Sequence, residues 1–78
     1  MKAIIYFKDA AGKEPAIIDG LNLILADYGN VSKHGKRYDT PEKLKKFSPY
    51  ADESYAFQGI DGSVSVIGTE ILKVEIKD

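Results

Sequence analysis

The sequence contains no cysteine and no tryptophan, and it has one histidine, one methionine and three prolines among 78 residues. Without cysteine the chain forms no disulfide framework, holds no metal through thiolates and offers no cysteine nucleophile. The apolar run at residues 3–7 is shorter than the roughly 7–15 residues of a signal peptide and the roughly 20 of a membrane span. We therefore expect a cytoplasmic protein that has no membrane partner.

An excess of charge of either sign is also lacking, because eleven Lys and Arg stand against twelve Asp and Glu. With 44% hydrophobic residues, this balance excludes a disordered chain, a strongly basic chromatin-type protein and a strongly acidic mimic of DNA. Most domains have roughly 100–150 residues, so residues 1–78 are expected to form a single domain. A domain this small buries only about 60% of its unfolded surface, which favours a function carried by the surface.

The hydrophobic pattern predicts strands at residues 2–8, 14–18, 54–60, 63–67 and 71–77. The last of these alternates apolar and charged side chains, as a strand does when one of its faces is in water. The dipeptide Asp61-Gly62 is a strong signal for a two-residue hairpin turn, and such a turn pairs Phe57 with Val66. One face of the hairpin then collects Tyr55, Phe57, Val64 and Val66.

Thr40, Pro41 and Glu42 form a helix start, because threonine caps free N–H groups and proline suits the first helical position. Pro49 ends this helix, which we place at residues 41–47. The predicted fold class is α+β, with one small antiparallel sheet of four to five strands and the short helix packed against it. The predicted core consists of Ile5, Phe7, Leu44, Phe47, Phe57, Val64, Val66, Leu72, Val74 and Ile76.

Residues 19–30 fit two structures. As a helix, Asp19 is the N-cap and apolar residues recur with helical spacing. As strands, Asp19-Gly20 is a turn and residues 22–28 form an apolar run. We favour the strand, and we read residues 29–40 as a loop with a strand at 36–39.

No residue is expected to be catalytic, to bind a cofactor or to ligate a metal, so the protein is predicted not to be an enzyme. His34 lies in a polar loop between cationic residues and has no matched nucleophile or carboxylate in the sequence pattern. Asp61 is accounted for as a turn residue, and the sequence contains neither a calcium loop nor a phosphate-binding glycine loop. Solvated or structural roles are the expected ones for these side chains.

The basic middle segment is the one feature with functional content. Residues 31–47 contain six Lys or Arg and two acidic residues, a net charge of +4, whereas residues 48–78 contain two Lys and six acidic residues, a net charge of −4. Cations interleaved with aromatic rings bind acidic protein surfaces or nucleic acid, although most such runs are simply solvated. The candidate interaction surface comprises Lys33, Lys36, Arg37, Tyr38, Lys43, Lys46 and Tyr50.

Both ends of the chain, residues 2–9 and 62–76, resemble small uncharacterised β-rich proteins of bacteriophages and prophages of Gram-positive bacteria. In those proteins a glycine, a strand and a tyrosine-glycine pair occupy the middle, which corresponds here to Gly20 through Tyr28-Gly29 and favours a strand there. The resemblance implies an accessory role in the host cytoplasm, in host takeover, defence evasion or a minor structural part. We therefore expect a non-enzymatic protein-interaction module with an unknown protein partner or a second copy of itself. The alternative is a small nucleic-acid-binding protein that uses residues 33–46.

Overall fold

The computed structural model describes residues 1–8, 14–27, 36–51 and 53–78. Over these residues the chain forms seven strands, one α-helix and one 3-10 turn. Their bounds are β1 (Lys2–Phe7), β2 (Ala16–Asp19), β3 (Leu23–Asp27), β4 (Lys36–Tyr38), α1 (Pro41–Lys45), β5 (Ser54–Gly59), β6 (Gly62–Ile67), η2 (Gly68–Glu70) and β7 (Ile71–Lys77).

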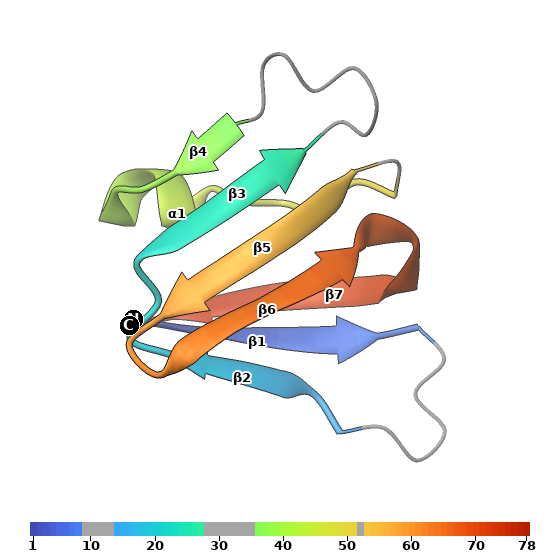
Figure 1. Ribbon diagram of the computed structural model, residues 1–78, viewed down its shortest axis with the longest axis horizontal. Helices are drawn as coiled ribbons and strands as arrows, with labels where there is room; N and C mark the ends of the chain where they lie inside the picture. Colours follow the sequence, from blue (N-terminus) through green and yellow to red (C-terminus); the bar gives the residue numbers. More distant parts are fainter. Residues whose placement is uncertain (9–13, 28–35, 52) are drawn as a thin grey trace.

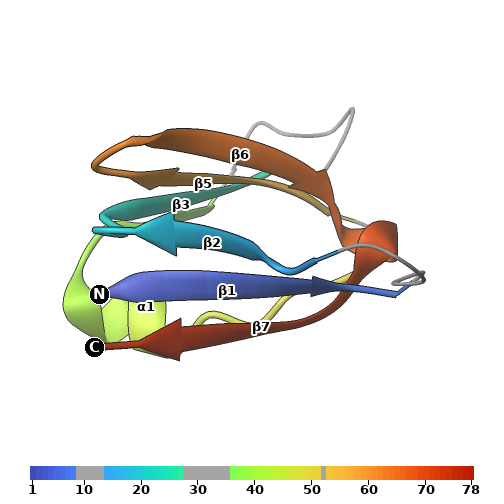
Figure 2. The same cartoon turned by 90° about the horizontal axis from the view of Figure 1, so that it is seen from below.

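The strands form two antiparallel sheets, one in the order β2-β1-β7 and the other in the order β4-β3-β5-β6 (Figure 1). The prediction of antiparallel structure with one short helix is confirmed. Instead of one sheet of four to five strands, however, the described residues form seven strands in two sheets. The apolar face of a sheet needs a second layer to cover it, and here the second sheet supplies that layer (Figure 2).

The core lies between the two sheets, and its largest fully buried side chains are Phe57, Ile5 and Ile24. Phe47, which follows α1, meets three aromatic rings edge to face, at centroid distances of 5.1 Å to Tyr38, 5.1 Å to Tyr55 and 5.6 Å to Phe57. Of the predicted core, five residues are buried: Ile5, Leu44, Phe47, Phe57 and Val66. Four more are half-buried and pack against these: Phe7, Val64, Val74 and Ile76.

Leu72 is the one predicted core residue that lies outside, with 61% of its surface exposed. The pairing of β1 with β7 shifts at this point, because Tyr6 is opposite Lys73 while Phe7 is opposite Ile71. Leu72 is thus the extra residue of a β-bulge, which breaks the strict alternation of the strand. The bulge turns Ile71, only 4% exposed, into the core.

The hairpin of β5 and β6 also differs from the predicted register. Gly59 is opposite Gly62 and Phe57 is opposite Val64, so the loop residues are Ile60 and Asp61. Only glycines among the described residues have positive φ, including Gly62 at 146°, whereas a type I′ turn requires positive φ at both loop residues. The shift of two residues along β6 leaves every side chain on its predicted face.

The remaining predicted elements lie close to their expected positions. β3 confirms the strand in the ambiguous segment, and Gly20, with φ of 59°, forms the turn before it. The strand expected at 36–39 is β4, and the strand expected at 14–18 is β2, shifted toward the C-terminus. α1 ends at Lys45 rather than at residue 47, and the hydroxyl of Thr40 accepts a hydrogen bond from the Lys43 N–H at 3.2 Å.

The two sides of the sandwich differ in how the edge strands of the two sheets are covered. On one side α1 lies between β4 and β7, where Tyr38 meets Phe47 edge to face and the Lys45 ammonium is 3.2 Å from the Asp78 carboxylate. On the other side the edge strands β2 and β6 come close to each other without pairing (Figures 1 and 2). We call this second side the seam.

Candidate functional site

The four edge strands of the two sheets differ in charge. β4 carries Lys36 and Arg37, β7 alternates charged with apolar residues, and β2 has only four residues directly after Pro15. β6 has no charged residue and no proline over its six residues. Charges, proline and short length protect sheet edges against pairing with other chains. Among the edges that the structure describes, β6 is the unprotected one.

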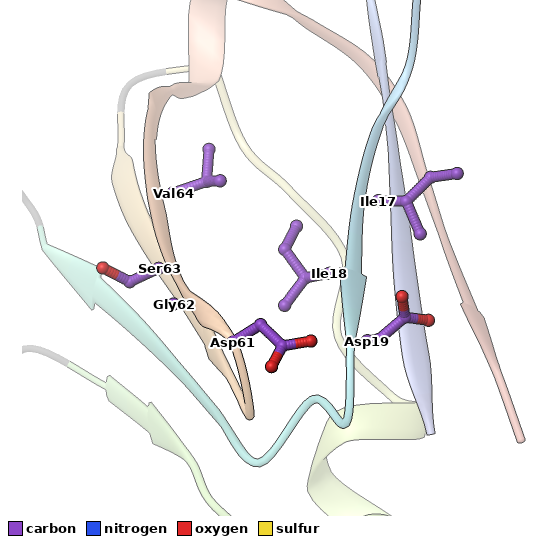
Figure 3. A pocket seen from close by; sticks show the side chains of 7 residues that line it. All are labelled: Ile17, Ile18, Asp19, Asp61, Gly62, Ser63 and Val64. Atoms are coloured by element: carbon purple, nitrogen blue, oxygen red, sulfur yellow. The ribbon is translucent and has the colours of Figure 1, made fainter.

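A slot of about 270 Å³ lies between β2 and the β5–β6 hairpin, lined by residues 17–19 and 61–64 (Figure 3). The side chains of Ile18 and Val64 point into the slot from opposite walls, and that of Asp61 extends from the hairpin turn toward β2. Two aliphatic side chains therefore face each other across the slot, and one carboxylate lies at its end.

The slot is closed at the end of the hairpin turn. There the Asp19 carbonyl oxygen accepts a hydrogen bond from the Ile60 N–H at 3.1 Å, and the Gln58 carbonyl accepts one from the Asn22 N–H at 3.0 Å. Gly59 makes this approach possible, because a Cβ at this position would overlap the Asp19 carbonyl oxygen. From this junction the strands diverge (Figure 3).

The backbone of β6 presents hydrogen-bonding groups along its free edge, and residues 62–64 of this edge line the slot. Gly59 and Gly62 flank a two-residue loop, and such a closing pair exchanges its own N–H and C=O groups. Hydrogen-bonded and non-hydrogen-bonded pairs alternate along an antiparallel ladder. Consequently the N–H and C=O groups of Ser63 and Ser65 point away from β5, and no backbone partner is found for them among the described residues.

The backbone of β2 faces the slot in the same manner. The Asp19 carbonyl is bonded to Ile60, so it points away from β1, and by the same alternation the N–H and C=O groups of Ile17 do too. The side chains of Ile17 and Asp19 lie on the outer side of the sheet (Figure 3). Each wall of the slot therefore has one apolar side chain that points into the slot. Each wall also has peptide groups that point away from the wall's own sheet.

The electrostatics of the slot are set by its acidic residues. None of the lining residues is a lysine, arginine or histidine, and neither Asp19 nor Asp61 has an ion-pair partner within 4.0 Å among the described residues. Lys2 lies opposite Asp19 in the ladder with β1, on the outer face of the sheet. The Asp61 carboxylate is thus the charge that a molecule in the slot would meet.

Two other polar clusters have structural explanations. The Tyr55 hydroxyl accepts a hydrogen bond from the Tyr50 N–H at 2.6 Å and donates one to the buried Glu53 carboxylate at 3.0 Å. Burial, together with this carboxylate, raises the pKa of the Tyr55 phenol. On the outer face of β1, the Tyr6 hydroxyl donates to Glu75 at 2.6 Å, and this bond lowers the pKa of the Glu75 carboxyl.

The predicted interaction surface lies on β4, on α1 and on the residues that follow α1. Lys33 lies outside the described residues. Arg37 and Lys43 both approach Asp39, at 3.8 Å and 3.6 Å, whereas Tyr38 faces inward. The other members are the exposed Lys46, Tyr50, which is 60% exposed, and Lys36 on β4. Nucleic-acid binding by residues 33–46 stays a prediction.

Comparison of the chain with models of protein families, with curated proteins and with solved structures gives no match. Within the described residues, no helix has the length and apolar character needed to cross a membrane. No group of three or more His, Cys, Asp or Glu residues in that part of the chain is arranged to hold a metal ion. The geometry of the seam is therefore the basis for inferring a function.

Proposed function

We propose that this protein is a non-enzymatic interaction module that binds an extended segment of another protein as an added strand in the seam. The observation that supports this proposal is that peptide groups on two neighbouring edges point away from their own sheets. These are the groups of Ser63 and Ser65 on β6 and of Ile17 on β2, and Ser63 and Ile17 both line the slot. Strand addition uses such groups for affinity and the pockets between them for specificity.

The size and lining of the slot favour a peptide over a small molecule. Pockets for drug-sized ligands have about 300–1,000 Å³ and several convergent polar side chains. The slot has about 270 Å³, and apart from Asp61 the groups that face it are apolar side chains and backbone. A docked strand needs only room for alternate side chains, since its main chain bonds to the sheet edge.

The direction of the added strand follows from the directions of the walls. β2 and β6 run in opposite directions (Figure 1), so a strand between them is antiparallel to one and parallel to the other. Antiparallel pairing is slightly the more stable per residue, and β6 is the longer wall, with six residues against four. The added strand therefore runs antiparallel to β6.

The proposed biological setting is an accessory role in a host cytoplasm, in host takeover, defence evasion or a minor structural part. The resemblance of both chain ends to small phage proteins supports this setting. So does the size of the domain, because strand addition requires a free sheet edge rather than a deep cavity. The partner in this setting is a protein that exposes an extended segment.

Hydrogen exchange measured by NMR tests the proposal. Binders are selected from a library of random 12-residue peptides, and amide exchange is then recorded with and without the tightest of them. We expect the amides of Ser63, Ser65 and Ile17 to become protected, because they acquire partners on the added strand. Failure to select any binder, or protection confined to β4 and α1, would overturn strand addition at the seam.

Two variants separate an effect at the edge from an effect on the sheet surface. Ser65→Pro removes an N–H that points away from β5, a position at which an edge strand tolerates proline, and we expect it to weaken peptide binding by at least about tenfold. Gln58→Lys adds a charge to the outer face of the same sheet, but on the interior strand β5. This control should bind peptide as the unmodified protein does, with circular dichroism confirming that both variants fold.

A further inference from the structure

We infer that the bound segment contains an aliphatic residue followed, two positions later, by a lysine or arginine. This inference rests on the proposed function, since it concerns the chemistry of the strand added at the seam. It draws on three observations about the walls of the slot, which concern Val64, Gly62 and Asp61.

The aliphatic position is opposite Val64. Residues directly opposite each other in a ladder place their side chains on the same face, so the residue facing Val64 points into the slot. There it lies between Val64 and Ile18, whose side chains enter from the two walls (Figure 3). An aliphatic side chain at this position packs against both of these side chains, and the removal of apolar surface from water is favourable.

The cationic position is opposite Gly62. In a strand antiparallel to β6, the residue two positions after the aliphatic one faces Gly62 and points to the same side. Gly62 has no side chain, and a Cβ added there would meet no atom within 4 Å. A long side chain therefore has free space at this point of the slot.

Asp61 determines the charge of that long side chain. Its carboxylate extends into the slot beside Gly62 (Figure 3), and none of the lining residues is cationic. Lysine and arginine can lay their aliphatic stems along the apolar wall while the charged end reaches the carboxylate. The order of the two residues is set by the strand direction, because a strand parallel to β6 would place the cation before the aliphatic residue.

Peptide selection on two protein variants tests this inference. Libraries are selected against the unmodified protein, against Asp61→Asn, and against Glu42→Gln, which removes the same charge on α1. We expect the aliphatic-any-basic pattern with the unmodified protein and with Glu42→Gln, and loss of the basic preference with Asp61→Asn. An equal basic preference with Asp61→Asn would overturn the role of Asp61.

Binding constants of synthetic peptides complete the test. Replacing the lysine of a selected peptide by glutamine should weaken binding to the unmodified protein by about 2- to 5-fold at low salt, the range of an exposed ion pair. The same replacement should have no effect on binding to Asp61→Asn. A peptide with the two residues in reversed order should bind more weakly.

The two levels of the proposal fail in different ways. Peptides that protect the amides of Ser63, Ser65 and Ile17 but show no preference for a cation would overturn the inference and leave strand addition intact. Absence of any binder would overturn strand addition itself. Peptides with the reversed order, cation before aliphatic residue, would overturn the antiparallel direction.

Discussion

Truncation of two neighbouring residues on β7 tests the bulge that places this strand on the core. Ile71 is 4% exposed and Leu72 is 61% exposed, although the alternation of the sequence assigns Leu72 to the core. We expect Ile71→Ala to lower the free energy of unfolding by about 2–5 kcal/mol, because it removes buried atoms and leaves a cavity. Leu72→Ala should change it by less than about 0.5 kcal/mol, as surface substitutions do.

Urea unfolding followed by circular dichroism measures both changes. In a domain of 60–100 residues each kcal/mol shifts the melting temperature by about 4–8 °C, so Ile71→Ala should melt at least about 8 °C lower. The slope of the free energy against urea should be the same for both variants, since it reports the surface exposed on unfolding. If Ile71→Ala leaves too little folded protein, Ile71→Val supplies the comparison, with an expected cost of about 0.5–1.5 kcal/mol.

The opposite ranking would refute the reasoning. If Leu72→Ala destabilises the protein more than Ile71→Ala, then Leu72 faces the core and the ladder between β1 and β7 has no extra residue. Val74→Ala serves as a reference within the same strand. Val74 lies opposite the buried Ile5 and is half-buried itself, so an intermediate cost is expected under the register described here.

Three further predictions concern polar contacts and close packing. Tyr55→Phe removes the hydroxyl that pairs with the Glu53 carboxylate and the Tyr50 N–H. We expect it to lower the free energy of unfolding in urea by about 1–3 kcal/mol, and an unchanged free energy would contradict this. Gly59→Ala should lower the melting temperature, because its Cβ collides with the β2 backbone. Tyr6→Phe should raise the pKa of Glu75, which can be measured by NMR of the side-chain carboxyl carbon during a pH titration. The Tyr6–Glu75 bond stabilises the fold at neutral pH and is lost as pH falls through the lowered pKa of Glu75, so the stability difference between Tyr6→Phe and the unmodified protein should disappear in acid.

Local chemistry was predictable wherever a short stretch determines its own structure. The threonine cap and the proline at residues 40–41 predict α1, and the alternation along residues 54–67 predicts a hairpin with its inward and outward faces. Face assignment survives the error in the hairpin register because the shift is two residues and side chains alternate with period two. For β3 the sequence left a helix and a strand as alternatives, because its leucines and isoleucine suit a buried helix equally well.

The seam itself could not be predicted, because it depends on which strands become neighbours. The sequence shows that residues 62–67 carry no charge, and this is the signal that could have singled out β6. An uncharged strand is ordinary in the middle of a sheet and exceptional at an edge. Only the order of strands in the two sheets places β6 at an edge and brings Ile17 opposite it.

What the sequence alone determined is therefore the set of elements, the short helix and the sidedness of most strands, because these depend on contacts between near neighbours and on hydrophobic periodicity. The tertiary structure decided the division into two sheets, the bulge at Leu72 and the slot beside Asp61. Each of these results from pairing between segments distant in the chain, where many arrangements bury similar apolar area. Packing in three dimensions selects one arrangement among them.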